Sequence, residues 1–432
     1  MKAGISKQKI TPPVGVDLTG YLGRPGPSNK LHDDLFVTAL ILDDGDSRIG
    51  IISMDVLGTD LDQDARLRRA ISESTGIDAD NLMIVATHTH AGPALSTLRE
   101  CGEPDETFVC QLWPKIVQTA KAACENMADA KLSFANAESE LAWNRRAWVI
   151  DSDVQRSKTS GVITDPNIGA ILIEIAGSEP VLLYNYACHG VVMDSDNVEI
   201  SADWIGAARD KLESSGLVGT SIFLQGCCGN INPRWRGTFA EVQRAGLSVA
   251  EPLLEALPKA KPLAEPSIKV AWRYVDLPYD PLPDKEVLQQ EISFRRSEFE
   301  KAQAEGNALM QKAHRAMLDW AQDALDMINA GDGPESIRVG LQAISLGDVI
   351  FVTLPGEAFC EYGLWFRDMT DAAVIPVGYA NGNIGYIPTA EAYKEGGYEV
   401  DSAIKYYGVK MIGPGSEKVI VDAARDMIKE IG

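Results

Sequence analysis

Long apolar runs, cysteines and histidines are all scarce in this chain. No segment reaches the roughly 18 to 20 consecutive apolar residues that cross a bilayer. The opening segment, Met1 to Lys7, lacks the apolar core of a signal peptide. Seven cysteines in 432 residues are too few for a disulfide framework, although Cys101 and Cys110 could pair. These absences exclude a membrane-spanning protein and favour a cytoplasmic location.

Positive charge is also in deficit, with 40 Lys and Arg against 62 Asp and Glu and a formal net charge of -22. Such a surface repels a nucleic-acid backbone, so we expect no nucleic-acid partner. The sequence has neither a Gly-x-x-x-x-Gly-Lys phosphate loop nor a dinucleotide fingerprint, which disfavours kinases and nicotinamide dehydrogenases. The composition, 45% hydrophobic and 24% charged, is typical of a globular enzyme with a sizeable core.

Strand and helix patterns alternate along the chain. Segments 35–42 and 49–54 are apolar runs of strand length, and the turn residues between them predict an antiparallel pair. Residues 62–75 have helical spacing and end at Gly76, and 81–86 is a short apolar strand. The alternation continues through helices at 108–128 and 204–214, strands at 168–175, 181–186 and 221–224, and a hairpin at 337–352. These patterns predict an α/β fold of mixed β-sheets flanked by helices.

Residues 284–330 differ from the rest, being charged and rich in alanine. Asp284 is placed as a helix cap and Gly306 as a break, which predicts an antiparallel helical hairpin or one bent helix. We interpret this segment as a packing or homo-oligomer element without chemistry, and its His314 as a solvated helix residue. No internal repeat or low-complexity linker is evident. We therefore predict a single catalytic domain over residues 1–432 with one helical insertion.

Three of the five histidines lie where a predicted strand ends in a loop. His88 and His90 follow one strand, and alternation in an extended segment would point both to the same face. One imidazole can then bind a metal while the other serves as a second ligand or proton carrier, the alternative being two ordinary buried histidines. His189 ends the apolar run 182–187 in a similar way.

Two histidines and one carboxylate form a standard catalytic zinc set that leaves a position open for water. Glu357 is the best carboxylate candidate, because it follows the strand at 349–353 within a Pro-Gly turn. The alternative is a turn residue or a charge at a helix N-terminus. Tyr386, in a glycine-rich loop, either packs or offers its phenol to a metal or an oxyanion.

Cys227 and Cys228 offer a different chemistry. They follow the strand at 222–224, so a thiol nucleophile acting with His189 is conceivable. Adjacent thiols in a turn of small residues are more often inert packing.

The segments that carry these residues occur in a characteristic order. Thr87-His88-Thr89-His90-Ala91-Gly92-Pro93 comes first, His189 with Ile200-Ser201-Ala202-Asp203-Trp204 second, and Pro355-Gly356-Glu357 third. Further segments are Thr11-Pro12-Pro13, Gly20-Tyr21, His32-Asp33, Ser53-Met54-Asp55, Asn144-Arg145, Asp165-Pro166 and Gly378-Tyr379-Ala380-Asn381 through Tyr386. In this order they resemble the catalytic domain of the neutral (non-lysosomal) ceramidase family over nearly the whole chain.

The resemblance implies a set of roles. His88, His189 and Glu357 would be ligands of a Zn²⁺ cofactor, with Tyr386 as a fourth or outer ligand. His90 would lie beside the metal and carry protons. Arg145 would face the substrate and, with Tyr386, stabilise an oxyanion or hold a substrate carboxylate.

Two departures from the family pattern matter. The family's Gly-Asn-x-Ser-Pro-Asn segment aligns with 229–234, where Asn232 replaces the catalytic serine. A serine mechanism is therefore excluded, and Asn232 is left as a hydrogen-bond donor. The family also carries a carboxyl-terminal β-sandwich and is usually secreted or membrane-associated, whereas this chain ends about 45 residues after Tyr386 without an export signal. We therefore expect a substrate other than ceramide.

The predicted function is zinc-dependent hydrolysis of an amide bond in a small soluble substrate by a metal-activated water. An ester or lactone hydrolase is the alternative, and a non-catalytic, metal-containing binding protein is another, supported by Asn232. Arg145 and Arg146 together favour an anionic substrate, unless they pair with acidic residues on the surface.

Overall fold

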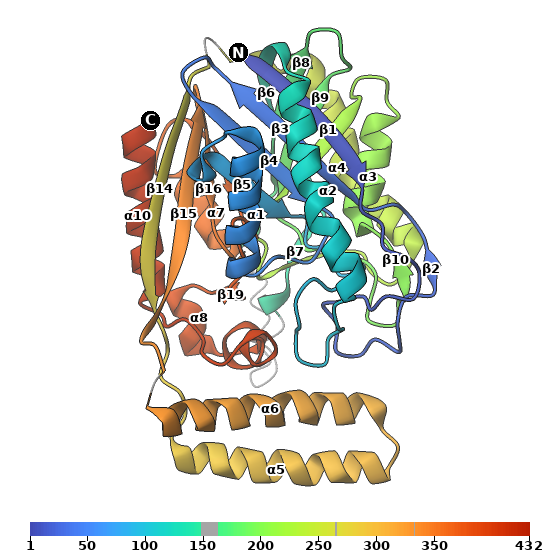
Figure 1. The fold of residues 1–432 in the computed structure, drawn as a ribbon, viewed down its shortest axis with the longest axis vertical. Helices are drawn as coiled ribbons and strands as arrows, with labels where there is room; N and C mark the ends of the chain where they lie inside the picture. The colour runs from blue at the N-terminus through green and yellow to red at the C-terminus, as the bar shows by residue number, and fades with distance from the viewer. Residues whose placement is uncertain (148–162, 264–265, 332) are drawn as a thin grey trace.

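The computed structural model describes residues 1–147, 163–263, 266–331 and 333–432. Two β-sheets are packed between layers of helices (Figure 1). Leu40 and Ile51 of the larger sheet share one buried cluster with Ile344 and Phe351 of the smaller sheet, so the two sheets pack face to face. Alternate side chains of the same strands point outward into separate clusters with the helices. The predicted fold class, mixed β-sheets flanked by helices, is confirmed.

Within the described residues the larger sheet has nine strands, in the order β11-β9-β8-β6-β1-β3-β4-β5 with β13 beside β6. They are β1 (Lys2–Lys9), β3 (Phe36–Asp43), β4 (Arg48–Met54), β5 (Leu82–Ala86), β6 (Ala128–Glu138), β8 (Asn167–Ile175), β9 (Val181–Tyr186), β11 (Thr220–Gln225) and β13 (Lys261–Pro262). β3 and β4 pair antiparallel as predicted, with Asp43 opposite Arg48 at the turn.

The smaller sheet has the order β14-β15-β16-β18. Its strands are β14 (Ile268–Pro278), β15 (Ser336–Leu346), β16 (Val349–Thr353) and β18 (Ala373–Val377). β15 and β16 form the hairpin predicted at 337–352, with Gly347 in the left-handed region at its turn. Three further sheets have two short strands each. They pair β2 (Lys30–Leu31) with β10 (Glu199–Ile200), β7 (Ala142–Asn144) with β12 (Ile231–Pro233), and β17 (Glu357–Ala358) with β19 (Tyr386–Ile387).

Helices cover the outer faces of both sheets. The larger sheet carries α1 (Leu61–Thr75), α2 (Glu106–Glu125), α3 (Asp203–Glu213) and α4 (Phe239–Ala256), and the smaller sheet carries α7 (Cys360–Arg367) and α10 (Ser416–Ile431). α1 begins at a capping box made by Asp60 and Gln63 and ends, as predicted, at left-handed Gly76. Between β19 and α10 lie α8 (Ala390–Glu395), a π-helical turn (Tyr398–Ser402) and α9 (Ile404–Tyr407).

One arrangement of elements occurs three times. In each copy, three antiparallel strands are followed by a helix, a fourth strand parallel to the third, and a second helix that packs on the first strand. The copies are β1-β3-β4-α1-β5-α2, β6-β8-β9-α3-β11-α4 and β14-β15-β16-α7-β18-α10. The expectation of no internal repeat is therefore wrong for the structure. The same strand pairing recurs although the residues differ, because sheet topology depends on main-chain hydrogen bonds that any residue except proline can make.

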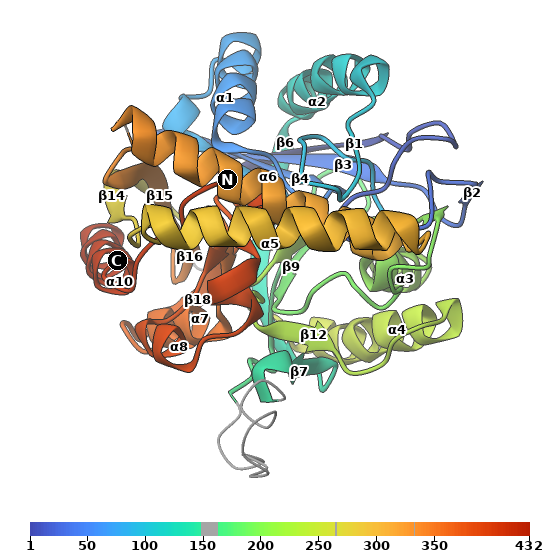
Figure 2. The same ribbon diagram turned by 90° about the horizontal axis from the view of Figure 1, so that it is seen from below.

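The segment 284–330 is an antiparallel hairpin of α5 (Lys285–Ala304) and α6 (Ala308–Ala330) that lies across one end of the molecule (Figure 2). Left-handed Gly306 breaks the two helices as predicted. Asp284 occupies the N-cap position of α5, but its side chain accepts no hydrogen bond there. No helix in the described part of the chain combines the length and apolar character needed to cross a membrane.

The inner helix α6 joins the hairpin to the body of the molecule. The indole N–H of Trp320 donates to the carbonyl of Val409 at 2.9 Å, and Arg99 pairs with Asp323 at 2.5 Å. His314 is buried, so the prediction of a solvated histidine was wrong. It belongs to the face of α6 turned toward α5, where its Nδ1 lies 3.4 Å from Arg295.

Candidate functional site

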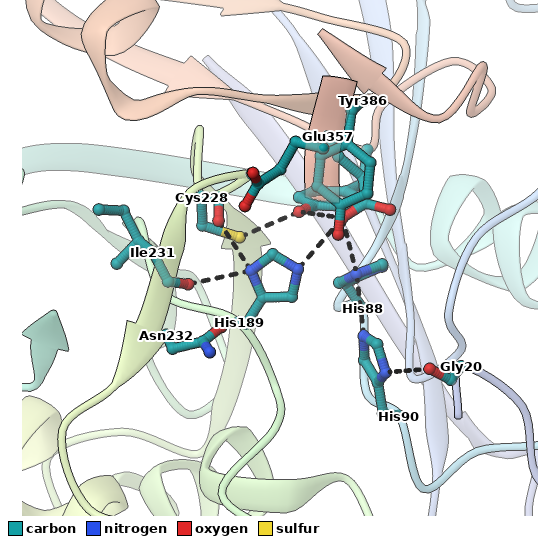
Figure 3. A network of polar contacts seen from close by, with 12 residues as sticks. Gly20, His88, His90, His189, Cys228, Ile231, Asn232, Glu357 and Tyr386 are labelled. Atoms are coloured by element: carbon teal, nitrogen blue, oxygen red, sulfur yellow. Dashed lines mark hydrogen bonds and ion pairs between the residues drawn. The ribbon is translucent and has the colours of Figure 1, made fainter. Parts of the chain in front are cut away.

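The predicted site residues meet where the ends of the strands of all three repeats converge. His88 and His90 follow β5, His189 follows β9, and Glu357 follows β16. Figure 3 shows the three imidazoles turned toward one another beside Glu357 and Tyr386. An isolated bridge between Thr89 and Gly190 ties the two histidine loops together. Segments about 100 and 270 residues apart thus form one site because strands of both sheets end close together there.

All three imidazoles are held by backbone carbonyls at Nδ1. The Nδ1 of His88 donates to the carbonyl of Leu57 at 2.7 Å, and that of His90 donates to Gly20 at 3.1 Å. The Nδ1 of His189 donates to the carbonyls of Cys228 and Ile231, at 2.7 and 2.9 Å (Figure 3). A carbonyl only accepts, so Nδ1 carries the hydrogen in each ring and Nε2 presents a lone pair.

These lone pairs point at a common centre. The Nε2 atoms of His88 and His90 are 3.2 Å apart, and ligand atoms of His88, His90 and His189 all lie within 4.8 Å of one another. Unprotonated nitrogens at such distances repel unless a cation lies between them. Burial and the neighbouring imidazoles hold the pKa of His90 well below its ordinary value, and burial lowers the pKa of His189 to about 4. Neutral imidazoles of this kind are metal ligands, and this group could hold a metal ion.

Glu357 supplies a carboxylate to the same centre. Its Oε2 lies 3.1 Å from Nε2 of His189 and 3.5 Å from Nε2 of His88, and the residue is almost completely buried. Tyr379 donates to Oε2 at 3.3 Å, and Tyr407 donates to Oε1. Burial acts to raise the pKa of Glu357, but positive charge on His88 and His189 outweighs it and holds the pKa well below the usual range. A cation bound at the centre would supply that charge in place of the ring protons. The centre therefore brings together imidazole nitrogens and one ionised carboxylate, donor types that suit a divalent cation such as zinc.

The backbone of His88 differs from the extended geometry on which the sequence argument relied. Its φ is 63°, in the left-handed region, where histidine is less disfavoured than most side chains. The two histidines do meet, but through a turn at His88 and not through strand alternation. Such a conformation persists only where surrounding contacts fix it, here the hydrogen bonds of its ring and of its backbone N–H to Val56.

Tyr386 faces Glu357 across a short parallel pair of strands, in which the two residues are direct partners. Its hydroxyl accepts a hydrogen bond from Nη2 of Arg145 at 2.9 Å. Asn232 also joins this side of the site, because its Oδ1 accepts from Nη1 of Arg145 at 3.3 Å. The structure therefore brings together all seven residues named from the sequence, which are His88, His90, Arg145, His189, Asn232, Glu357 and Tyr386.

A family model for the N-terminal domain of neutral/alkaline non-lysosomal ceramidases matches residues 1–247, more than half of the chain. The chain belongs to this ceramidase family. It is 25% identical over 442 residues to the neutral ceramidase of Mycobacterium tuberculosis (strain ATCC 25618 / H37Rv), a match that covers 88% of this chain and 69% of that protein.

Solved ceramidase structures share the fold. The neutral ceramidase from Pseudomonas aeruginosa matches with a TM-score of 0.74 at 18% identity, over 99% of this chain and 73% of that one. A ceramidase complexed with C2 matches with a TM-score of 0.74 at 16% identity, over 100% and 75% of the respective chains. The family resemblance and the hydrolase class are thus confirmed, and family membership supports action on an amide bond.

In this ceramidase-family chain the two arginines do not form a free anion-binding pair. Arg145 donates from Nε to Glu399 at 2.8 Å, and Arg146 donates from Nη1 to the other oxygen of the same carboxylate at 2.8 Å. Arg146 also pairs with Glu395 at 3.2 Å. The two guanidinium charges are therefore paired with two carboxylates, and this pairing removes the support for an anionic substrate. The alternative, pairing with acidic residues, holds, although Glu399 is buried and not on the surface.

The cysteines do not form a nucleophilic pair with His189. Burial raises the pKa of Cys227 to about 12 and that of Cys228 well above its ordinary value. The Sγ of Cys228 lies 3.2 Å from the hydroxyl of Tyr379, and His189 contacts the backbone carbonyl of Cys228 instead of its thiol. A thiolate is needed for attack, so the packing interpretation of these thiols is favoured.

Sequence reasoning missed four residues that shape the site. Tyr379 and Tyr407 hold Glu357, Glu399 holds Arg145, and the indole of Trp204 donates to the carbonyl of His189 at 2.9 Å. Tyr379 and Trp204 lie inside motifs already noted, so their position beside ligand segments was an available signal. Glu399 and Tyr407 had no such signal in the sequence.

Proposed function

We propose that this chain is a zinc-dependent hydrolase that cleaves an amide bond, with His88, His189 and Glu357 as ligands and Tyr386 as a fourth or outer ligand. The observation that carries the proposal is the convergence of three carbonyl-fixed imidazoles and one ionised carboxylate on a buried centre. Residues of all three repeats contribute to this centre. We therefore also propose that residues 1–432 act as a single catalytic domain, with 284–330 as an insertion.

Zinc bound by these residues would act as a Lewis acid that lowers the pKa of water toward about 7. That chemistry needs no serine, which fits the presence of Asn232 where the family has one. His90 is suited to moving the proton, since its Nε2 lone pair faces the centre while Gly20 fixes its ring. His90 accepts a proton at Nε2 and returns it to the leaving amine.

The opposite side of the centre stabilises negative charge on the substrate carbonyl oxygen. The hydroxyl of Tyr386 accepts a hydrogen bond of 2.9 Å from Arg145, which polarises the phenol and leaves its O–H to donate to that oxygen. The Oδ1 of Asn232 accepts from Arg145, which leaves its amide N–H groups as donors toward the substrate. These groups are fixed before the substrate arrives, so little reorganisation accompanies the reaction.

A cavity of about 520 Å³ lies next to the centre, and although none of the seven candidate site residues lines it, it supports an apolar group on the substrate. Two of its lining residues contact the candidate ligands directly. The carbonyl of Leu57 accepts from His88, and Tyr407 donates to Glu357. Apolar side chains that line the cavity include Leu57, Leu61, Leu95, Leu98, Ile384 and Ile404. We propose a small amide with an apolar acyl group, and an ester or lactone of the same shape as the alternative.

The first test is metal content and hydrolysis measured side by side. Wild type should bind about one zinc per chain and hydrolyse members of a panel of N-acyl amides from acetyl to octanoyl. His88→Ala and Glu357→Gln should lose both metal and turnover, whereas His32→Ala, whose ring stacks on Phe239, should keep both. Metal retained in His88→Ala, or full turnover after complete metal removal, would overturn the proposal.

The same experiment separates the remaining functions. Bound zinc with no hydrolysis of any amide, ester or lactone would establish the non-catalytic binding protein. Turnover of esters and lactones alone would establish the alternative substrate class. A cytoplasmic location and a homo-oligomer formed through residues 284–330 remain predictions, which fractionation and light scattering of the intact chain would check.

A further inference from the structure

Arg145 has little hydrogen-bonding capacity left for a substrate. Its Nε donates to Glu399, its Nη2 donates both to the carbonyl of Gly229 at 2.7 Å and to Tyr386 at 2.9 Å, and its Nη1 donates to Asn232. Within the described residues, four of the five guanidinium N–H groups therefore have protein acceptors. A carboxylate is held most strongly by two parallel N–H donors, and Arg145 cannot offer such a pair while these four acceptors are in place.

Glu399 reaches the site from a short segment with an unusual backbone conformation. It lies in the π-helical turn Tyr398–Ser402, directly after Gly396 and Gly397. Gly397 has φ 105° and ψ -179°, a conformation open essentially to glycine alone. The turn brings the Gly396 carbonyl to Nη2 of Arg146 at 2.8 Å and the buried carboxylate of Glu399 between the two arginines. Each oxygen of Glu399 is thereby committed to one guanidinium.

The pairing of Arg145 with Glu399 affects how the products of amide hydrolysis bind. The reaction breaks the C–N bond and joins the oxygen of water to the acyl carbon, and proton transfer leaves a carboxylate and an ammonium ion. The new carboxylate forms beside Arg145 and Tyr386. An unpaired guanidinium at that position would hold the carboxylate through charge-assisted hydrogen bonds and slow its release.

We propose that Glu399 is a positioning residue that keeps Arg145 turned toward Tyr386 and withholds its charge from the carboxylate product. The inference rests on the proposed function for the identity of that product. It explains why a half-buried and a buried arginine, Arg145 and Arg146, lie beside a reaction centre without making it an anion-binding site. Glu399 thereby favours neutral substrates and fast loss of the acid product.

The test is direct binding of octanoate to the intact, zinc-loaded chain by titration calorimetry, a readout that needs no turnover. Glu399→Gln keeps the shape of the side chain but removes its charge, so octanoate should bind at least about tenfold more tightly than to wild type. Octylamine, the cationic counterpart, should not gain affinity. Equal octanoate affinity in a folded, zinc-loaded Glu399→Gln would overturn the proposal.

Matched variants separate charge from a general structural effect. Glu395→Gln removes a carboxylate that pairs with Arg146 at 3.2 Å, and octanoate affinity should change less than twofold. In the double variant Glu399→Gln with Arg145→Met, the gain in affinity should vanish. Should Glu399→Gln not fold, Glu399→Asp retains the charge at a shorter reach, and it should keep weak octanoate binding while lowering kcat more than KM changes. Tight octanoate binding to Glu399→Asp would count against the proposal.

The outcomes distinguish this inference from the proposed function. If wild type binds zinc but hydrolyses no amide, and Glu399→Gln still gains octanoate affinity, the role of Glu399 stands and the proposed reaction fails. If wild type hydrolyses amides and Glu399→Gln gains no affinity for octanoate, the proposed function stands and the role of Glu399 fails.

Discussion

Gly20 accepts a hydrogen bond from Nδ1 of His90 on a backbone that has no space for a side chain. Its φ is 92°, and a Cβ added there would lie 2.4 Å from that same nitrogen. The contact fixes both the tautomer of His90 and the direction of its Nε2. The glycine therefore acts on the chemistry of the site without contributing a functional group.

Gly20→Ala should displace the His90 ring and lower the rate of hydrolysis about 100-fold or more, the range expected for loss of a positioned proton carrier. Zinc content should stay near that of wild type, since the three proposed ligands are elsewhere. Metal analysis and steady-state rates of the same preparation measure both quantities.

Gly15→Ala is the matched control for Gly20→Ala. Gly15 has φ 111°, but a Cβ added there would meet no neighbouring atom within 4 Å, so its substitution adds backbone strain without a collision. Hydrolysis should remain close to wild type. If both variants lose activity equally, strain in the loop and not the position of His90 is responsible.

Alkylation of the thiols should leave the activity intact. Iodoacetamide reacts with thiolates, and burial raises the pKa of Cys227 and Cys228 far above neutral pH, whereas Cys110 is exposed. Mass spectrometry after labelling at about pH 7.5 should find the label on Cys110 before either buried thiol. Loss of turnover that follows labelling of Cys227 or Cys228, with zinc retained, would favour a cysteine mechanism instead.

Trp204→Phe should weaken both the fold and the metal site. It leaves the buried carbonyl of His189 without its 2.9 Å partner, which costs about 1–3 kcal/mol of unfolding free energy. Loss of a partner of a ligand's side chain typically weakens metal binding about 10–100-fold, and because Trp204 contacts the backbone of His189 the loss should stay within that range. Competition with a chelator measures the affinity. Trp365→Phe, on the outer helix α7, serves as the control for loss of an indole. Unchanged zinc affinity in Trp204→Phe would show that this contact only supports the fold.

Asp64 should make the stability of the protein depend on pH. Burial raises its pKa to about 7, although Arg68, 3.8 Å away, acts to lower it. Asp60 adds a smaller repulsion that also raises it. The folded chain therefore binds more protons than the unfolded chain between about pH 4 and pH 7, and the stability contributed by this residue is lost as pH rises through about 7.

Asp64→Asn removes that dependence, because the amide stays neutral at every pH. At about pH 5 the variant and wild type should unfold with free energies within about 1 kcal/mol, and at about pH 8 the variant should be more stable by about 2 kcal/mol. Urea unfolding at the two pH values gives the comparison. The same difference at both values would mean that Asp64 does not titrate in this window.

The sequence contained most of the local information about the fold. Apolar runs and turn residues located β3, β4 and β5, and Gly76 and Gly306 ended helices as expected, because these signals act over a few residues. The left-handed backbone of His88 depends on partners from other segments, and no local pattern encodes it. The threefold repeat was also not predicted, because it consists of a repeated order of strand pairing and not of repeated residues.

Only those site residues that lie within short sequence motifs could be predicted. His88, His189 and Glu357 were found because they lie in short segments at strand ends. Glu399 is 254 residues from Arg145 in the chain, so the ion pair that neutralises Arg145 could not be predicted from the sequence. For the same reason two arginines in sequence suggested an anionic substrate that their buried partner does not support.

The three repeats determine when the site can be completed. The first repeat supplies His88 and His90, the second His189, and the third Glu357 and Tyr386, so no single repeat holds a full set of donors. During synthesis Glu357 emerges about 170 residues after His189, when the residues of the first two repeats, which share one continuous sheet in the folded chain, have already been made. If the proposed metal site is correct, tight metal binding requires that the third repeat has docked, and metal uptake would mark the end of the maturation of this chain.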